Sequence, residues 1–442
     1  MLYVYLTQNT AMQTASSGLA PNTTARITAM DTIRGIALFG ILLMNIIGFG
    51  LYKAYFDPTN NGGSTGWSLN VWWMNMLFFE GTMRGMFSML FGAGILLFTG
   101  RATSGTQESV TDTFFRRLLW MILFGVIHCY LLLWDGEILY TYGIVGMFAF
   151  SFRHLKPGKL LIGAACILLV STAFSVADYI DHKEAYTQAT AARAKRAKGL
   201  VLNTKETEAI AKWNGIEKQE KYSPQQVQDE IKARSKGYWS IVQHKLPENV
   251  YMQTHFLYFI GFWDTLAMML WGMAFFKWGI LKAEKSRRFY LLMALIGYGI
   301  GITINYFETA HIVDQQFSIL SFYRNFVSYQ FGRVPTTCGH IALIMLFVQS
   351  GILPWLRKAL AAVGQMAFSN YIMHSLICNF IFLGYGLSMY GKLQRYELYY
   401  IVAGIWLFQL IASPIWLHYF RFGPLEWVWR SLTYWQRQPF RK

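Results

Sequence analysis

Two apolar stretches of this chain each contain an arginine followed eleven positions later by an amide or imidazole side chain. Arg34 precedes Asn45 in "MDTIRGIALFGILLMNIIGFG", and Arg117 precedes His128 in "RRLLWMILFGVIHCYLLLWDGEIL". At about 100° per residue this spacing returns to nearly the same helix face, about 16 Å further along the axis. Each pair therefore predicts one polar stripe on an otherwise apolar helix.

His128 is the candidate for proton transfer. An imidazole titrates near neutral pH and can act as a general base, and Asp135 and Glu137 follow it closely. Asn45 falls at the same predicted depth, so both groups are expected to face a cavity that leans outward. The alternative is that they are contacts inside a helix bundle, worth about 0.6 to 2 kcal/mol for an interhelical hydrogen bond. We predict His128 as catalytic, with Asn45, Asp135 and Glu137 beside it.

Five more polar side chains lie in the same predicted outer half. Glu80 and Arg84 are spaced as an i, i+4 ion pair, Ser88 shares a face with Arg84, and Asn370 and His374 are one helical turn apart. Polar groups in hydrocarbon are costly and tend to mark sites or paired contacts. We predict these five as substrate-binding residues; the alternative is that the ion pair fastens two helices and the others are bundle contacts.

The composition identifies the elements that must position these groups. Hydrophobic residues make up 54% of the 442, aromatic residues 17% and charged residues only 14%, and the mean hydropathy is +0.29. These values predict an all-α polytopic membrane bundle. Apolar runs long enough to cross about 30 Å of hydrocarbon suggest about ten spans, the ninth long enough to be tilted or broken. The predicted spans are Ile33–Tyr52, Thr82–Thr99, Phe115–Leu133, Ile138–Phe152, Leu160–Val176, Thr254–Phe276, Phe289–Phe307, Thr336–Ile352, Leu360–Tyr390 and Tyr399–Phe420.

The formal charge of +16 comes from short basic clusters between spans rather than from one continuous stripe. This pattern is typical of topology signals and argues against nucleic acid as a partner. It predicts both termini on the cytoplasmic side, with few basic residues in the opposite loops, Arg333 among them. The predicted parts are a flexible N-terminal segment (1–29), a first membrane half (30–180), an external polar helical insertion (181–250), a second membrane half (251–420) and a basic cytoplasmic tail (421–442).

Four cysteines occur singly within apolar runs, without CxxC pairs or histidine-spaced clusters. We therefore expect neither a metal site nor a disulfide, and interpret them as small buried hydrophobic residues. The chain also lacks GxSxG, P-loop, HExxH and dinucleotide-binding motifs. The four residues are Cys129, Cys166, Cys338 and Cys378.

Several motifs together resemble the YeiB-type family of integral membrane proteins, a domain of unknown function. They are "DTIRGIALFGILLMN", "FSMLFGAG", "GVIHCYLLLWDGEIL", "GQMAFSNYIMHSLICNFIFLGYGLSMYGKL" and "GPLEWVWRSLTY", and the resemblance runs from about Met30 to Tyr434 without much of Asp181–Val250. It implies a multi-pass protein of the bacterial inner membrane, with the lipid bilayer as its surroundings. A homo-oligomer is compatible with the sequence.

The first motif also resembles the opening span of heparan-α-glucosaminide acetyltransferase, a member of a superfamily of transmembrane acyltransferases. Asn45 matches an asparagine there, but the position of that protein's catalytic histidine, eleven residues later, is Phe56 here. The resemblance implies acyl transfer from cytoplasmic acyl-CoA, the expected donor, to an external carbohydrate or envelope acceptor. His128 would replace the missing base, and Asn45 would hold the acyl carbonyl or oxyanion. The donor phosphates would meet Arg34, Arg116 or Arg117.

Two other classes of function fit the same residues. In a transporter or flippase the polar stripe would line a path, although no internal repeat is visible and Pro414 is the only proline well inside a predicted span. In a sensor or assembly protein the external insertion would carry the function, and replacing Asn45 and His128 would change nothing.

Overall fold

The computed structural model describes residues 28–61, 63–100 and 107–442, and the regular secondary structure of this part of the chain is helical, apart from one isolated bridge between Phe420 and Arg441. The predicted N-terminal segment 1–29 therefore lies almost wholly outside the described residues. The helices are α2 (Thr28–Gly50), α3 (Gly66–Met74), η1 (Asn75–Phe79), α4 (Thr82–Gly100), α5 (Gln107–Tyr130), α6 (Leu139–Phe150), α7 (Pro157–Ala197), α8 (Thr204–Glu220), α9 (Pro224–Arg234), α10 (Tyr238–Tyr251), η2 (Met252–Gly261), α11 (Phe262–Lys277), η3 (Ile280–Lys282), α12 (Arg287–Asp314), α13 (Ile319–Ser350), α14 (Pro354–Gln365), α15 (Ala367–Phe382), α16 (Leu398–Tyr419) and α17 (Pro424–Tyr434).

The prediction of a polytopic helical bundle is confirmed. Within the described ranges, seven helical stretches are long and apolar enough to cross a membrane. Fewer stretches meet this criterion than the ten spans predicted, partly because α6 has 12 residues and the predicted ninth span is divided into α14 and α15 at Met366. That division agrees with the expectation of a broken span. The seven stretches are Thr28–Gly50, Gly66–Gly100, Pro157–Ala197, Tyr238–Lys277, Arg287–Asp314, Ile319–Ser350 and Leu398–Tyr419.

Helix α2 lies at the centre of the bundle, with 78% of its most apolar window buried. It packs against α14, α4, α15 and α16. The contact with α14 is backbone to backbone, because a Cβ on Gly35 would overlap the Leu360 carbonyl and one on Gly364 would overlap the Asp31 carbonyl. The glycine of the "DTIRG" motif is therefore a requirement of close helix contact.

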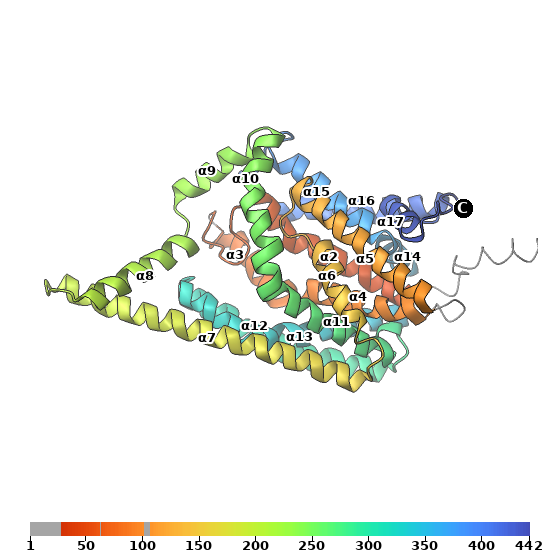
Figure 1. The fold of residues 1–442 in the computed structure, drawn as a ribbon, viewed down its shortest axis with the longest axis horizontal. Helices are drawn as coiled ribbons and strands as arrows, with labels where there is room; N and C mark the ends of the chain where they lie inside the picture. The colour runs from red at the N-terminus through yellow and green to blue at the C-terminus, as the bar shows by residue number, and fades with distance from the viewer. Residues whose placement is uncertain (1–27, 62, 101–106) are drawn as a thin grey trace, which may run out of the picture.

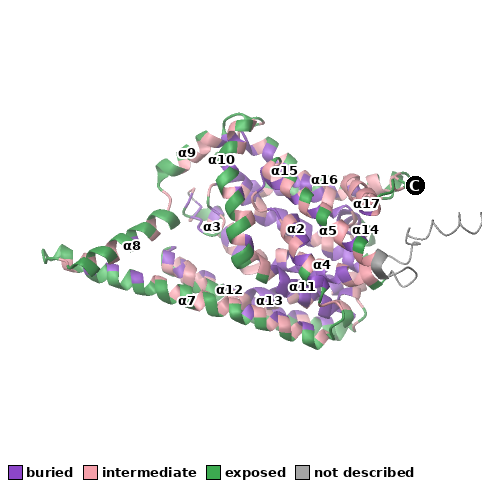
Figure 2. Cartoon of the chain, viewed as in Figure 1, coloured by how far each residue is buried: buried purple, intermediate pink, exposed green. Residues whose placement is uncertain are grey.

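Helices α7, α12 and α16 form the periphery and expose large apolar side chains, such as Phe174 on α7, Leu295 on α12 and Leu407 on α16. Figure 2 shows the buried residues gathered in α2, α4 and α11 while α7 is mostly exposed or intermediate. A soluble protein rarely exposes so much apolar surface. The periphery is therefore the surface expected to face lipid.

The predicted external insertion is helical and continues an element of the bundle. Helix α7 runs without a break through residue 181 to Ala197, about 60 Å in all. Figure 1 shows α7 and α8 extending beyond the other helices at the end opposite the C-terminus, from where α9 and α10 return to the bundle. Helix α10 then continues through η2 into α11, which positions it over the same end as the connection between α5 and α6.

Candidate functional site

His128 lies in the last turn of α5, with both ring nitrogens directed at side chains from other elements. Its Nε2 is 2.7 Å from Ser375 Oγ on α15, and its Nδ1 is 3.5 Å from Glu137 Oε1, which is long for a hydrogen bond. The imidazole is fully buried and Ser375 is 1% exposed. The edge of the His128 ring also contacts the ring of Tyr371. The three polar groups form a series in which Ser375 is within hydrogen-bond distance of one imidazole nitrogen and Glu137 faces the other.

Glu137 is held in place by the start of α6. Its Oε1 accepts from the backbone N–H of Leu139 at 2.5 Å, and its Oε2 accepts from that of Tyr140 at 2.8 Å. The first N–H groups of a helix have no partner within the helix, and the helix dipole favours an anion there. The carboxylate is therefore fixed by two backbone donors while facing His128.

Asp135 does not contact His128, although the sequence predicted it beside the imidazole. Its Oδ1 accepts from Lys245 Nζ on α10 at 2.7 Å. Burial raises the pKa of Asp135, but the positive charges of Lys245 and Arg234 outweigh this and lower it to about 2. Of the two acids, Glu137 lies beside the histidine, whereas Asp135 is paired with Lys245 of helix α10.

Helix α10 covers the segment 131–138 that connects α5 to α6. Lys245 Nζ also donates to the Leu133 carbonyl, Asn249 Nδ2 donates to the Cys129 carbonyl, and Tyr238 Oη donates to the Leu131 carbonyl. Since His128 and Glu137 lie directly before and within this segment, helix α10 packs over the segment that carries them, and both residues are buried.

Asn45 is partly exposed on α2 and makes no side-chain hydrogen bond within the described ranges. One turn later, Phe49 stacks on Trp134 of the segment 131–138 with ring centroids 3.9 Å apart. Asn45 thus lies one turn before the residue of α2 that contacts the segment 131–138, and its amide makes no hydrogen bond to the described residues.

Asn370 and His374 belong to a network between α15 and α16. Asn370 Nδ2 donates to the Val363 carbonyl and to Ser413 Oγ, while Gln409 donates to the Asn370 carbonyl and lies 3.1 Å from His374 Nε2. Both predicted residues are buried and satisfied by protein groups. They fasten the helix that carries Ser375.

The predicted ion pair between Glu80 and Arg84 is absent from the described part of the chain. Glu80 and Gly81 form a turn, with Gly81 at φ +66°, so the two charged residues do not share one regular helix. Glu80 instead accepts from Tyr329 Oη at 3.0 Å, and Arg84 lies 3.5 Å from Asp264. Helical spacing predicts pairing only where the helix is continuous.

Arg84 and Ser88 face a buried polar layer between α4 and α6. Ser88 Oγ is 2.7 Å from Tyr142 Oη, and Tyr142 Oη donates to the Arg84 carbonyl at 3.4 Å. The Arg84 side chain is 42% exposed, whereas Ser88 and Tyr142 are each 1% exposed. Of these groups, Arg84 is the least buried.

Sequence reasoning missed Asp264 and misplaced Arg333. Arg333 was expected in an outer loop but lies inside α13, which begins at Ile319 rather than near Thr336. It is 1% exposed and donates to both oxygens of Asp264 and to Gln330. An aspartate within an apolar run, as Asp264 is, was the available signal, because an intramembrane carboxylate needs a partner.

The three predicted donor-binding arginines gather at the opposite end of the bundle. Arg34 pairs with Asp31 at 2.8 Å and donates to the Gly364 carbonyl. Arg116 donates to the Thr433 carbonyl of α17 at 2.5 Å. Arg117 lies over the Trp429 ring at 4.0 Å and has no ion pair in the described ranges. Arg116 and Arg117 therefore lie where α5 contacts α17, whereas Arg34 lies where α2 contacts α14.

The terminal motif "GPLEW" has a structural explanation. Glu426 accepts from the backbone N–H groups of Phe368 and Ser369 at 2.7 and 3.0 Å, and from Ser369 Oγ at 2.5 Å. It thereby caps the N-terminus of α15 from another helix. This cap fixes the axial position of α15 and hence of Ser375.

The described residues contain no group of three or more histidine, cysteine, aspartate or glutamate side chains that could hold a metal. The four cysteines are free thiols. Cys129 and Cys378 are buried as expected, whereas Cys166 is exposed and Cys338 is intermediate, because their helices α7 and α13 lie nearer the periphery.

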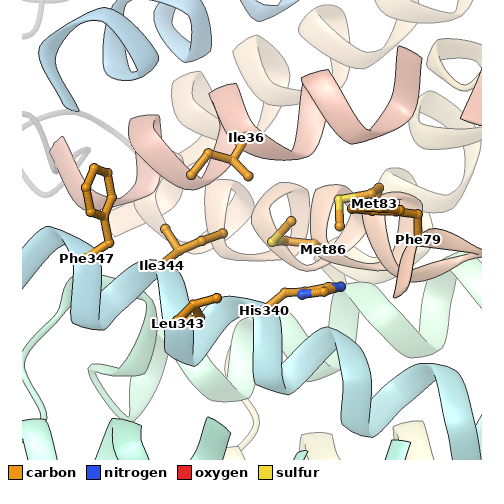
Figure 3. Close-up of a pocket in the computed structure, with 8 residues that line it drawn as sticks. All are labelled: Ile36, Phe79, Met83, Met86, His340, Leu343, Ile344 and Phe347. Carbon is orange, nitrogen blue, oxygen red and sulfur yellow. The ribbon is translucent and has the colours of Figure 1, made fainter. Parts of the chain in front are cut away.

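A separate apolar cavity of about 420 Å³ lies between α2, α13 and the η1–α4 segment. Figure 3 shows His340 among its lining residues on α13. Both ring nitrogens of His340 are occupied, because Nε2 donates to the Phe78 carbonyl at 2.7 Å and Nδ1 accepts from Tyr298 Oη at 2.9 Å. The cavity is lined by Ile36, Phe79, Met83, Met86, His340, Leu343, Ile344 and Phe347.

Comparison with known proteins places this arrangement in a family. A sequence profile described as "Protein of unknown function (DUF418)" matches residues 275–436. The chain is 30% identical to "Uncharacterized protein YxaH" of Bacillus subtilis (strain 168), over 96% of this chain and 99% of the relative. It is 29% identical to "Uncharacterized protein YeiB" of Escherichia coli (strain K12), over 92% and 96%. No solved structure matches significantly.

Proposed function

This chain belongs to the DUF418 family of YxaH and YeiB, and from that premise we propose that it is an acyltransferase of the bacterial inner membrane. Its donor is cytoplasmic acyl-CoA and its acceptor is an external carbohydrate or another envelope hydroxyl or amine. The names of the relatives supply no activity, so the proposal depends on the side chains described above and on the resemblance of the first span to a transmembrane acyltransferase.

The single observation that supports this function is the buried series Ser375, His128 and Glu137. A serine hydroxyl at 2.7 Å from an imidazole whose other nitrogen faces a carboxylate is the arrangement used in acyl transfer through a covalent intermediate. The carboxylate favours the tautomer with its proton on Nδ1, which leaves Nε2 free to accept the proton of Ser375.

In the first half-reaction, Ser375 Oγ attacks the thioester carbonyl while His128 Nε2 takes the hydroxyl proton. The carbon–sulfur bond breaks, the proton passes from His128 to the departing thiolate, and an ester forms on Ser375. In the second half-reaction, His128 removes a proton from the acceptor, which attacks the ester. The ester bond breaks and the proton returns to Ser375. Asn45, whose amide makes no hydrogen bond within the described ranges, is the proposed partner of the acyl oxygen.

The arginines at the other end of the bundle suit the donor. Arg117 is eleven residues, or about 16 Å, before His128 on the same helix. Its guanidinium lies against an aromatic ring without a carboxylate partner in the described ranges, so it can pair with a phosphate. Arg34 and Arg116 flank it, and an extended thioester arm bound there would point along the helix toward Ser375.

The test is transfer of label from acetyl-CoA by the purified protein in lipid vesicles. Without an acceptor, the wild-type protein is expected to acquire one acetyl group on Ser375, identified by peptide mass spectrometry. With cell-envelope extract, label passes to an extract component. Ser375→Ala and His128→Ala are each expected to lower transfer by roughly 10³-fold or more. Ser413→Ala is the matched control, because Ser413 is equally buried but contacts Asn370.

Transfer that survives Ser375→Ala but not His128→Ala would contradict the covalent route and favour direct transfer, with His128 acting on the acceptor. If the folded wild-type protein neither binds nor turns over acetyl-CoA or longer donors, the acyltransferase proposal is wrong. Transport of a solute that depends on Arg84 would then support the transporter hypothesis.

A further inference from the structure

The apolar cavity between α2, α13 and the η1–α4 segment has no part in the proposed acyl transfer. We propose that it holds one acyl chain of an anionic phospholipid, taken sideways from the bilayer. This site goes beyond the proposed function and does not depend on it. Its lining is shown in Figure 3 and is apolar except for His340.

The chemistry of the lining excludes a polar ligand. Both ring nitrogens of His340 are already hydrogen-bonded, to the Phe78 carbonyl and to Tyr298 Oη. The Phe79 ring stacks on the His340 ring, with centroids 6.3 Å apart. What remains for a ligand to touch is aromatic carbon, methionine side chains and branched aliphatic side chains, which favour hydrocarbon.

The size and position of the cavity fit one acyl chain of a lipid. One water occupies about 30 Å³ in the liquid, and a methylene group is of similar size, so about 420 Å³ has room for on the order of a dozen methylene groups. Along α13 the lining extends from His340 to Phe347, about 10 Å of helix axis. Leu343, within that stretch, is 53% exposed.

The exposure of Leu343 indicates how the ligand enters. α2, α4 and α13 all belong to stretches long and apolar enough to span a membrane, so a surface opening beside Leu343 meets lipid chains rather than water. A phospholipid can reach it without leaving the bilayer, whereas a water-soluble donor such as acyl-CoA would have to cross the interface first.

Basic groups at the end of α13 complement an anionic headgroup. Directly after Phe347, two of the last carbonyls of α13 accept from arginines: Arg287 donates to the Gln349 carbonyl and Arg357 to the Val348 carbonyl, each at 2.8 Å. Arg288 and Lys358, adjacent in sequence to these two, are exposed. Juxtamembrane basic clusters attract anionic lipids, and this is the end predicted to be cytoplasmic.

The experiment uses phosphatidylglycerol with a photoactivatable diazirine in one acyl chain, in phosphatidylcholine nanodiscs that contain the full chain. After irradiation, mass spectrometry is expected to locate the label on the lining residues of α2, α4 and α13. Unlabelled phosphatidylglycerol should compete at about tenfold lower concentration than phosphatidylcholine. The double variant Arg288→Gln/Lys358→Gln should abolish the preference for phosphatidylglycerol, while the lipid's acyl chain still labels the cavity.

A filling substitution provides the second arm. Ile344→Trp, whose side chain is buried in the lining, is expected to reduce labelling about tenfold. Leu291→Trp is the matched control, because Leu291 is an exposed apolar residue of α12 outside the cavity. Size-exclusion profiles report whether each variant folds. If Ile344→Trp does not fold, the positions of the label and the lipid competition measured with the wild-type protein test the proposal by themselves.

Two results would overturn the proposal. Labelling spread evenly over the exposed faces of α7, α12 and α16 would show only the general lipid shell. Labelling of the cavity by a diazirine acyl-CoA but not by phosphatidylglycerol would show that the occupant is the donor's chain. A negative result for lipid binding leaves the acetyl-transfer experiment unaffected, because that experiment measures covalent labelling of Ser375.

Discussion

The ion pair between Asp135 and Lys245 offers a quantitative test of how helix α10 holds the segment beside the His128 site. The Lys245 side chain is 3% exposed and that of Asp135 26% exposed, at an N–O distance of 2.7 Å. Although burial opposes it, the pKa of Asp135 is lowered from 3.8 to about 2 by Lys245 and Arg234. Since one pH unit corresponds to about 1.4 kcal/mol, this amounts to about 2 kcal/mol in favour of the folded state at neutral pH.

Asp135→Asn removes this contribution and leaves the Lys245 charge without its carboxylate. We expect the free energy of opening of residues 131–138, measured by hydrogen exchange at pH 7, to fall by about 2 kcal/mol, or roughly 30-fold faster exchange. Asp229→Asn is the control, because Asp229 is exposed on α9 and is not in an ion pair in the described ranges.

The pH dependence follows from the lowered pKa of Asp135. A carboxylate whose folded pKa is depressed contributes fully above its unfolded pKa, here 3.8, and loses the contribution as the pH falls through about 2. The difference between wild type and Asp135→Asn should therefore be constant from pH 7 to 5 and about half as large at pH 3. Equal hydrogen exchange of residues 131–138 in the two proteins at pH 7, or a difference that does not change with acidification, would refute the inference that the Asp135–Lys245 ion pair holds α10 over this segment.

Three further substitutions test the framework of the site, each measured by thermal unfolding in detergent or nanodiscs. Glu426→Gln should destabilise by about 1 kcal/mol, because it weakens the cap of α15; an unchanged midpoint would contradict the capping role. Gly364→Val should destabilise by about 3 kcal/mol or more, since its Cβ overlaps the α2 backbone; tolerance would show that α14 can move away. Asp264→Asn should cost about 3 to 5 kcal/mol by leaving Arg333 buried without its carboxylate, and adding Arg333→Met should recover much of that; no recovery would mean that the carboxylate acts through Arg84 instead.

Parts of the candidate site could be found from sequence because they lie close together along the chain. His128 and Glu137 are nine residues apart, and an imidazole beside a carboxylate at the end of an apolar run is visible without a structure. Ser375 could not be found, because it is 247 residues from His128 and one of many serines in apolar runs. Only the docking of α15 on α5 distinguishes it.

The partners of the buried charged residues could not be predicted from the sequence either. Arg84 meets Asp264 and Arg333 meets the same carboxylate, across three helices. The local rule that pairs Glu80 with Arg84 fails because Gly81 interrupts the helix. Local rules describe neighbours on one helix, whereas a buried charge takes its partner from whichever helix packs against it.

The sequence by itself determined the membrane class and the helical architecture, because hydropathy and helical period are properties of consecutive residues. The tertiary structure alone decided that Glu137 rather than Asp135 faces His128, that Ser375 completes the series, and that α10 covers it. The physical reason is that each of these contacts depends on the relative position of separate helices, which is set by backbone contacts such as Gly35 with α14 and by caps such as Glu426 on α15.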